Sequence, residues 1–468
     1  MISLIGTYNL HMFYPKRFLL GLGSLDELCN SARIQDLAKE HIQVLFNSQF
    51  STTDHYRIAT QLPHALVYEW EPCLLQGKYF NIGYDSKVLL QDLTTNELLI
   101  LRRLYLRHIQ SRKNQHTFEL ISLLMLRWII AILTRHDIDT VVCSQIPHQY
   151  ADYLLIPACR LLNIKILIVK SIQVFHSDAY RVWDPLANVY MDVSGSSIYD
   201  HEKVLRFSEK IHSKLIENNV PYTQQRFSRE SELRRKVSKE MLHNITCIDE
   251  TISERMITYL IDKKSMCKNL YDSSIKLDSL ASGRGHLVVF LHFEPECNVC
   301  PLGDINYDQL TFIDKLNILC KTLGLKLLVR EHPVQIRLPM AGVNVNSHFL
   351  MSNTRRPRDL YYYSLVERFS EFSGYCQLDS INDILSSASV LLTASVAGTV
   401  SLQSAIRGLN TVVGTSQWFD TIPGVYNIDN LIKSLADFQS TDHPVLNKRS
   451  PLNHSNFHEY IKNYIIVK

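Results

Sequence analysis

Long apolar runs are missing from this sequence. No stretch approaches the roughly 20 apolar residues that a membrane-spanning helix needs, and the longest candidate, Leu120–Leu133, is interrupted by Arg127. The first residues also lack the charged start, apolar core and small-residue cleavage site of a secretory signal. We therefore expect a cytoplasmic protein, with at most a peripheral contact at the inner membrane.

An excess of charge of one sign is also missing. Lys and Arg number 49 against 46 Asp and Glu, a formal net charge of +3, so no basic footprint predicts a nucleic-acid partner. A basic helical run, Arg226–Lys239, is typical of a solvated helix face, with a polyanion or membrane contact as the less favoured alternative. The length of 468 residues, 46% of them apolar, predicts two or three folded domains.

Paired cysteine spacing is the third absence. The ten cysteines follow no disulfide framework, and Cys143, Cys159 and Cys320 lie in apolar runs, which is typical of buried thiols in a reducing compartment. Cys297 and Cys300 form a lone CxxC with no second Cys or His pair at a zinc-site spacing. We expect neither a structural metal nor a redox role for this pair.

Short branched apolar runs alternate with amphipathic stretches in two parts of the chain, which predicts parallel sheets covered by helices. The expected strands of the first part are Ile42–Phe46, Ala65–Tyr68, Thr140–Cys143 and Ile164–Val169, with helices at Asn96–His108 and Phe118–Thr134. The second part predicts strands at His286–His292, Lys326–Arg330, Val390–Thr393 and Thr411–Gly414. Its expected helices are Tyr307–Leu323, Asp359–Phe369, Ile381–Ala388 and Thr399–Arg407.

The pattern divides the chain into four segments. Residues 1–199 form the first α/β domain and residues 281–440 the second. Residues 200–280 are polar and periodic, which predicts a helical connection. Residues 441–468 end in a helix that we expect to pack back on the first domain. Ligands of such sheets bind beyond the carboxyl ends of the strands, so residues that follow strands are the functional candidates.

Two clusters of polar residues follow strands of the second domain. Glu294 and Glu296 come directly after the first strand, where two carboxylates fit either a cleft edge or an ordinary capped loop. Arg330, Glu331, His332 and Pro333 end the next strand. Because the proline fixes the backbone, His332 is held at the carboxyl end, where it can donate a hydrogen bond or a proton to a departing phosphate.

A third cluster joins the strand Val390–Thr393 to the following helix. Gly398 lets the backbone approach an anion, and a helix N-terminus offers free N–H groups and partial positive charge. Hydroxyl groups on Ser395, Thr399 and Ser401 add donors. The segment lacks a Walker lysine and GxGxxG spacing, so it predicts a phosphate cradle outside both of those classes. Simple N-capping by Ser or Thr is the alternative.

The first domain offers a weaker candidate. His148 and Asp152 follow the strand Thr140–Cys143, where an acceptor site is expected, although a capped loop explains them equally well. Asp137 and Asp139 imitate a DxD metal motif, but they precede the same strand and so lie at the wrong end of the sheet.

Taken together, these clusters resemble the capsule polysaccharide biosynthesis family, which includes transferases that build the Kdo linker of capsules and related O-antigen enzymes. The resemblance is carried by LHFEPECNVCPLGDINYDQ, REHPVQ, RRPRDLYYYSLV, ASVAGTVSLQSAIRGLNTVVG and WFDTIPGVY. It covers His286–Tyr426 well and Ser144–Ile168 more loosely.

The resemblance implies a GT-B fold, with two Rossmann-like, doubly wound domains facing a cleft and a helical insertion between them. It implies a CMP-activated sugar donor, commonly Kdo, bound by the second domain. His332 would contact the nucleotide phosphate, with support from Ser395, Gly398 and Thr399. No separate cofactor is implied.

Two residues depart from the family pattern. Glu294 and Glu296 match a Gln-Pro-Glu element near the active centre, but Glu294 replaces its Gln. Gln403 stands where the family carries a Glu in the helix after the phosphate loop, and its neutral amide can still bond ribose hydroxyls. This leaves open another ulosonic acid or a different nucleotide sugar.

The expected activity is metal-independent transfer of a sugar to a glycan or lipid-linked glycan acceptor. An inverting route needs a base, for which Asp152 and His148 are the candidates, whereas a retaining route needs a carboxylate such as Glu296 on the other face. Two alternatives stay open: a UDP-sugar epimerase of the same architecture, and a non-catalytic protein of polysaccharide assembly.

Overall fold

The computed structural model divides the chain into two compact units. Unit 1 comprises Met1–Ser208 and Ile461–Lys468, and unit 2 comprises Glu209–Tyr460. The structure describes residues 18–21, 44–47, 52–61, 65–69, 88–108, 115–143, 146–147, 150–172, 179–195, 199–217, 285–292, 309–330, 374–375, 380–436 and 444–467.

Unit 1 is built on an eight-stranded sheet of order β14-β6-β5-β4-β1-β2-β3, with β7 paired to β6. Strands β1 to β5 run parallel, whereas β6 is antiparallel to β5 and carries β7 and β14 as antiparallel neighbours. The strands are β1 (Phe18–Gly21), β2 (Val44–Asn47), β3 (Leu66–Glu69), β4 (Thr140–Cys143), β5 (Lys165–Ser171), β6 (Ala179–Asp184), β7 (Val189–Tyr190) and β14 (Ile466–Val467).

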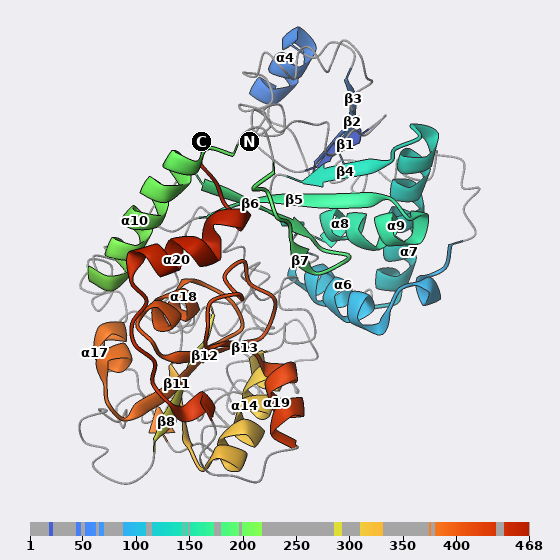
Figure 1. Ribbon diagram of the computed structural model, residues 1–468. Helices are drawn as coiled ribbons and strands as arrows, with labels where there is room; N and C mark the ends of the chain where they lie inside the picture. Colours follow the sequence, from blue (N-terminus) through green and yellow to red (C-terminus); the bar gives the residue numbers. More distant parts are fainter. Residues whose placement is uncertain are drawn as a thin grey trace, which may run out of the picture. The chain divides into compact units, whose positions relative to one another are not determined.

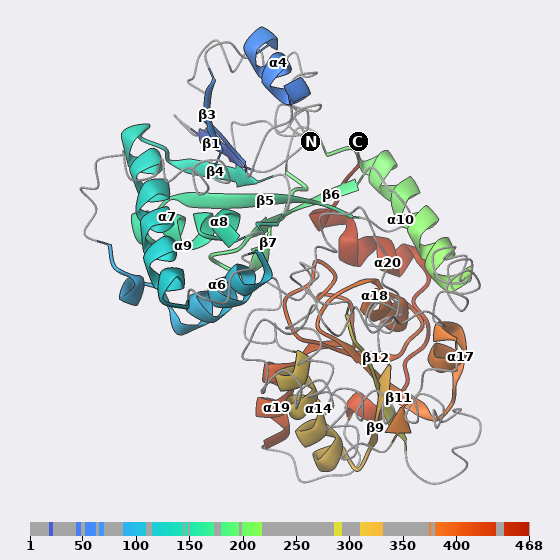
Figure 2. The same ribbon diagram turned by 180° about the vertical axis from the view of Figure 1, so that it is seen from behind.

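Helices cover this sheet. Helix α7 packs on α8 and α9 beside β4 and β5, as Figures 1 and 2 show from opposite sides. The buried Trp128 of α7 contacts Phe46 and Tyr68, which joins the helix layer to β2 and β3. The helices are α4 (Thr52–Gln61), η3 (Leu90–Asp92), α6 (Thr95–His108), α7 (Gln115–Arg135), α8 (Tyr150–Tyr153), α9 (Leu155–Leu162) and η10 (Lys462–Tyr464).

Unit 2 contains a six-stranded, fully parallel sheet of order β10-β9-β8-β11-β12-β13. Counted along the chain within the unit, this is the 3-2-1-4-5-6 order of a doubly wound nucleotide-binding sheet. From β8 the strands β9 and β10 are added on one side of the sheet, and β11 to β13 are added on the other side. The order therefore reverses between β8 and β11, and such switch points are where these sheets bind ligands. The strands are β8 (His286–Phe290), β9 (Lys326–Arg330), β10 (Gly374–Tyr375), β11 (Val390–Ser395), β12 (Asn410–Val413) and β13 (Val425–Asn427).

Both faces of this second sheet are buried against helices, as the apolar runs of its strands predict. Alternate residues of β8 divide between two cores: Leu287 and Val289 pack with α14 and α19, and Val288 packs with α17. Helices α14 and α19 lie side by side (Figure 1), and Lys315 bonds Asp429 across them at 2.6 Å. The helices are α14 (Gln309–Leu323), α17 (Ile381–Ser386), α18 (Thr399–Ile406), α19 (Ile428–Ala436), η9 (Pro444–Leu446) and α20 (His454–Ile461).

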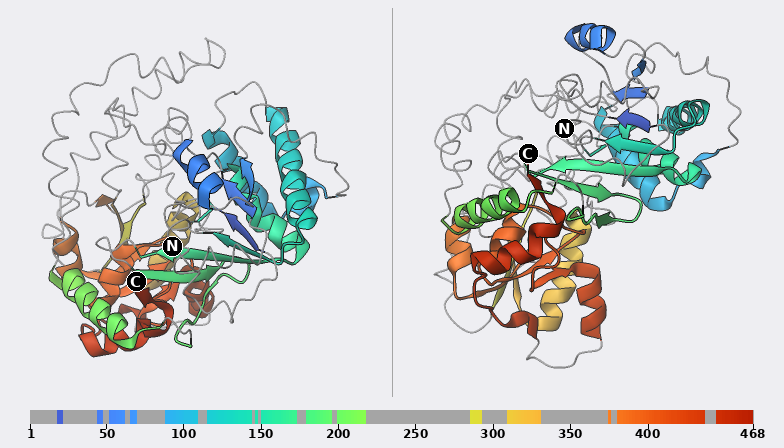
Figure 3. Two further views of the ribbon diagram at one scale, coloured as in Figure 1. Left: turned by 90° about the horizontal axis from the view of Figure 1, so that it is seen from above. Right: turned by 45° about the horizontal axis from the view of Figure 1, so that its top comes forward.

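Helix α10 (His201–Glu217) begins in unit 1 and ends in unit 2. Within unit 2 it lies beside α20 (Figure 3), where the ring of the buried His212 packs at a tilt against Phe457, with 5.6 Å between ring centroids. His212 Nε2 is also 2.7 Å from the Leu452 carbonyl oxygen. The two segments through which the chain passes from one unit to the other are thus held together inside unit 2.

The expected α/β class is confirmed, with a Rossmann-like sheet in each unit. Strands β4 and β9 have the predicted bounds. The C-terminal helix was predicted to continue to Lys468, but α20 ends at Ile461 and the chain pairs with β6 as the strand β14. The predicted helix Asp359–Phe369 and most of the segment 200–280 lie outside the described residues. Along the described stretches, no helix has both the length and the apolar character needed to cross a bilayer.

Candidate functional site

The candidate site lies where β8 and β11 end, at the switch point of the unit 2 sheet. His292 follows β8, and Ser395 is the last residue of β11. A tight turn then leads into α18, whose N-cap is Gly398. Because β8 and β11 are parallel neighbours, their carboxyl ends bring residues about a hundred positions apart in the sequence to one edge.

Gly398 has a backbone conformation that only glycine tolerates. Its φ of 114° and ψ of −179° lie in a region closed to residues with a Cβ atom. A Cβ added there would also meet His292 Cε1 at 2.9 Å. Both the backbone and the neighbouring imidazole therefore require glycine at this position, because the His292 ring fills the space that a side chain would need.

His292 is fixed at both its ring and its backbone. The Ala397 N–H donates to His292 Nε2 at 3.2 Å, which assigns the tautomer with an unprotonated Nε2. The His292 N–H donates to Gln309 Oε1 at 2.6 Å, and Gln309 Nε2 donates back to the His292 carbonyl oxygen at 3.1 Å. Gln309 is fully buried at the first position of α14.

Ser395 and Ser401 build the turn with their hydroxyl groups. Ser395 Oγ donates to the Ala397 carbonyl oxygen at 2.8 Å and is 2.6 Å from Ser401 Oγ. Since the single Ser395 hydrogen is used on Ala397, Ser401 donates to Ser395. Both side chains are 1% exposed. These bonds hold the loop in shape, and the expected part of the two hydroxyls in donor binding stays a prediction.

The loop ends at the first turn of α18. No side chain caps the helix, because its N-cap residue is Gly398, so the alternative of Ser or Thr capping is wrong. The first N–H groups of a helix lack internal acceptors and carry partial positive charge, which favours an anion. Thr399 is exposed on the first turn. Gln403, buried to 4% exposure, follows it four residues later and so lies on the same side of the helix.

Arg330 ends β9 and lies on the sheet face that packs against α17. It pairs with Phe290 in the ladder and is 8% exposed. The Ser380 hydroxyl chiefly holds the pKa of Asp383 below its usual value, and the Arg330 cation adds to this effect. Arg330 is thus a buried cation beside the first turn of α17, on the strand next to β8.

Most of the predicted polar clusters lie outside the described residues: Glu294, Glu296, Glu331, His332, Pro333 and His148. In the described part of the chain, no three His, Cys, Asp or Glu residues are grouped to hold a metal ion.

Asp152 of unit 1 lies in α8, the helix that follows β4 and its carboxyl end, and is 1% exposed. Burial chiefly raises the pKa of the nearby Cys143 thiol, with Cys159 and the Asp152 carboxylate adding to it. Asp152 is thus a buried carboxylate on a short helix just beyond the carboxyl end of β4, and its expected role as a base stays a prediction. Asp137 and Asp139 precede β4, as the sequence predicts, and Asp137 adopts a turn conformation with φ of 50°.

The sequence-based prediction ended a strand at His292 and gave neither His292 nor Gln309 a role. The available signal was a polar residue on the face of a helix whose other buried residues are apolar. That signal does not reveal which backbone groups the amide bonds. Only the folded chain brings the two residues together.

No family model matches this sequence, and neither does any curated protein. Among solved structures, it is similar to the KpsC β-Kdo 2,7-transferase of Thermosulfurimonas dismutans, with 10% identity, 80% of this chain and 89% of that chain covered, and a TM-score of 0.27. The UDP-GlcNAc 2-epimerase of Neisseria meningitidis bound to UDP-GlcNAc gives 9% identity, coverages of 95% and 97%, and a TM-score of 0.21. A putative UDP-N-acetylglucosamine 2-epimerase of Listeria monocytogenes is 10% identical, with 95% of this chain and 94% of that chain covered and a TM-score of 0.25. Similarities this weak do not identify an activity, so the function rests on the site.

Proposed function

We propose that this protein is a metal-independent GT-B glycosyltransferase of bacterial surface-polysaccharide synthesis, making capsule or O-antigen. It takes its sugar, Kdo or another ulosonic acid, from a CMP-activated donor held by unit 2. The observation that carries the proposal is the turn at the switch point of the 3-2-1-4-5-6 sheet. Its last position, Gly398, has a backbone conformation that requires glycine, and the helix that follows has no side-chain cap.

The turn has the chemistry that a nucleotide phosphate needs. No side chain caps α18, so in this proposal phosphate oxygens bind its first N–H groups. The exposed Thr399 hydroxyl adds a donor. Gln403, on the same side of the helix, is proposed to bond the ribose, and Arg330, Glu331, His332 and Pro333 are proposed to complete the donor site with Glu294.

As the bond between the anomeric carbon of the sugar and the CMP phosphate breaks, negative charge grows on the departing phosphate. The N–H groups of α18 stabilise that charge, and His332 is proposed to donate a hydrogen bond or a proton to it. We assign the glycan or lipid-linked glycan acceptor to unit 1, near the carboxyl end of β4. His148 or Asp152 would then serve as base for inversion, and Glu296 as the carboxylate for retention.

The test is a thermal-shift panel of CMP, CDP, UDP, GDP and ADP in the presence of a chelator. A nucleotide at 100 times its dissociation constant adds about 2.7 kcal/mol of stability. We expect stabilisation by CMP and its loss in Gly398→Ala. Gly324→Ala is the matched control, because Gly324 also has a positive φ (66°) but no atom within 4 Å of its missing Cβ. It lies in the turn between α14 and β9, before the amino end of that strand and away from the site.

Other outcomes separate the alternatives. Stabilisation by UDP alone, with conversion of a UDP-sugar in the absence of acceptor, would replace the transferase by an epimerase. A wild-type protein that answers to none of the five nucleotides would leave the non-catalytic assembly protein.

A further inference from the structure

Gln309 makes an unusual use of a buried amide. It is 0% exposed at the start of α14, a helix whose other buried residues are apolar. Burying an amide is costly unless its hydrogen bonds are made. Both of the bonds given above go to one residue, His292, through its N–H and its carbonyl oxygen. Gln309 therefore pairs with the backbone of His292 in the way that a neighbouring strand would.

This pairing continues the hydrogen bonding of the β8 backbone beyond the residues that pair with β9. The last backbone bond to β9 is made by the Leu291 N–H to the Arg330 carbonyl oxygen at 2.8 Å. One residue later, at His292, the backbone N–H and carbonyl oxygen bond the side chain of Gln309 instead. His292 thus leaves the sheet in a fixed direction, which a free loop would not ensure.

The fixed direction determines where the imidazole lies. The ring occupies the space next to Gly398 that a side chain there would need, and Nε2 accepts from the Ala397 N–H. A chain of contacts therefore runs from α14 through His292 to the turn before α18. It crosses from β8 to β11, the two strands that flank the switch point.

We propose that Gln309 is a positioning residue for the donor site: by holding the His292 backbone, it sets the imidazole that orients the Ala397–Gly398 turn for a nucleotide phosphate. The proposal rests on the function proposed above. A purely structural role is the competing explanation, since any buried amide with two hydrogen bonds contributes to stability.

Two variants and one control separate these roles. Gln309→Met keeps the length of the side chain and removes both bonds, whereas Gln309→Glu keeps the acceptor for the His292 N–H and loses the donor. The control is Asn410→Ala. Asn410 is also a buried amide of unit 2, and its Nδ2 donates to the Val445 and Asn447 carbonyl oxygens, but it begins β12 at the opposite edge of the sheet.

Two quantities are measured: the dissociation constant of CMP, and the hydrogen-exchange rate of the Ala397 amide relative to the Leu328 amide in the centre of β9. We expect Gln309→Met to weaken CMP binding about tenfold or more, since small displacements of a site cost up to about a hundredfold. The relative exchange of Ala397 should rise, and Gln309→Glu should recover part of both effects. Asn410→Ala should lower the melting temperature and leave both quantities near wild type.

The proposal is overturned if Gln309→Met melts earlier but keeps wild-type CMP affinity and Ala397 exchange. If Gln309→Met does not fold, Gln309→Glu decides by the same two quantities. If the wild-type protein binds no CMP, the proposed function fails, and the exchange of Ala397 still shows whether Gln309 orients the turn.

Discussion

At the scale of single residues, the positive-φ glycines of unit 2 differ in what surrounds them. Gly408 has a φ of 82°, and a Cβ there would overlap the Arg449 carbonyl oxygen. The Gly408 carbonyl oxygen itself accepts from the Arg449 N–H at 2.9 Å. This close backbone contact fastens the segment after η9 to the loop before β12.

Gly408→Ala is therefore expected to destabilise unit 2 more than Gly324→Ala. Both variants force a Cβ into a left-handed conformation, at about 1–2 kcal/mol, but only Gly408→Ala adds a clash with backbone. Urea unfolding of the two variants measures the difference. Equal losses would show that the Arg449 segment moves aside freely.

The buried thiols carry a second residue-scale prediction. Burial raises the pKa of Cys320 to about 12 and raises that of Cys159 still further. Because the thiolate is the reactive form, neither residue should react with a thiol reagent at pH 8 while the protein is folded. Counting labelled thiols in wild type and Cys320→Ala tests this: the native count should be the same in both, and the count in urea should fall by one in the variant.

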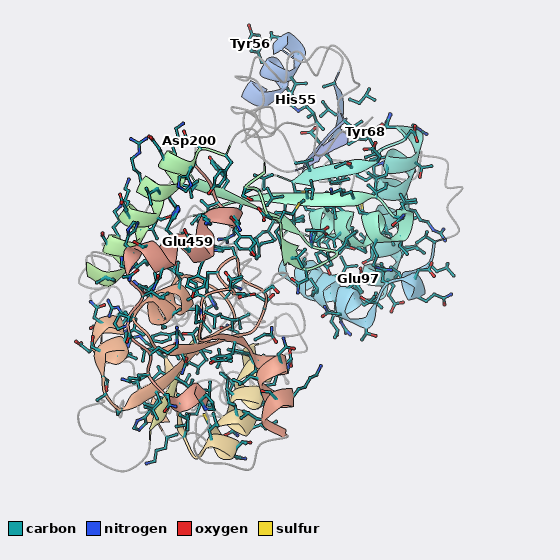
Figure 4. All side chains as sticks on the ribbon, viewed as in Figure 1. His55, Tyr56, Tyr68, Glu97, Asp200 and Glu459 are labelled. Atoms are coloured by element: carbon teal, nitrogen blue, oxygen red, sulfur yellow. The ribbon has the colours of Figure 1, made fainter. Side chains whose placement is uncertain are left out.

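At the scale of elements, Glu97, which is labelled in Figure 4, joins two helices of unit 1. It closes a capping box at the start of α6, accepting from the Thr94 N–H at 2.7 Å while its own N–H donates to Thr94 Oγ1. It also accepts from Arg160 of α9 through Nε at 2.8 Å and Nη2 at 2.7 Å. One buried carboxylate thus fixes both the start of α6 and its contact with α9.

Glu97→Gln should cost about 2 kcal/mol of unfolding free energy, the range of hydrogen bonds to charged groups. The matched control is Glu202→Gln in α10, since the Glu202–Arg206 pair is 84% and 70% exposed at its side chains and should change stability by less than about 0.5 kcal/mol. Chemical denaturation of both variants decides. A similar small loss in each would mean that the Arg160 bonds contribute nothing net.

Helix α17 offers a pH-dependent test. The Ser380 hydroxyl accepts from the Asp383 N–H and donates to its carboxylate, which lowers the pKa of Asp383. A lowered folded-state pKa contributes stability above the unfolded pKa, and this contribution is lost as the pH falls through the folded pKa. Ser380→Ala should cost about 1 kcal/mol at pH 7, and less as the pH approaches 3. A cost that is independent of pH would contradict the capping box.

At the scale of the whole molecule, the last residues return to unit 1. Strand β14 pairs with β6, and the Asn463 carbonyl oxygen accepts from the Val193 N–H at 2.7 Å. Truncation after Tyr464 should therefore raise amide exchange in β6 and β7 and leave β8 and β11 protected as before. Exchange measured by mass spectrometry tests this, and unchanged protection of β6 would show that β14 adds no stability.

Periodicity predicted much of this architecture. The runs that became β4 and β9 are short, branched and apolar, and a strand buried on both faces of a parallel sheet requires that composition. The small residues around Gly398 likewise predicted a turn into a helix. Strand β1 escaped prediction because Phe18–Gly21 has no β-branched residue and ends in glycine, unlike β4. Strand β6 escaped it because Arg181 interrupts its apolar residues.

The sequence by itself determined the α/β class, the two sheets and the place of the glycine turn, because each depends on residues close together in the chain. Only the tertiary structure decided that Ile466–Val467 pairs with β6 and that His292, held by Gln309, lies against Ala397 and Gly398. Such contacts depend on which strands become neighbours. That choice is made by the packing of the whole unit, since local periodicity carries no record of a partner a hundred residues away.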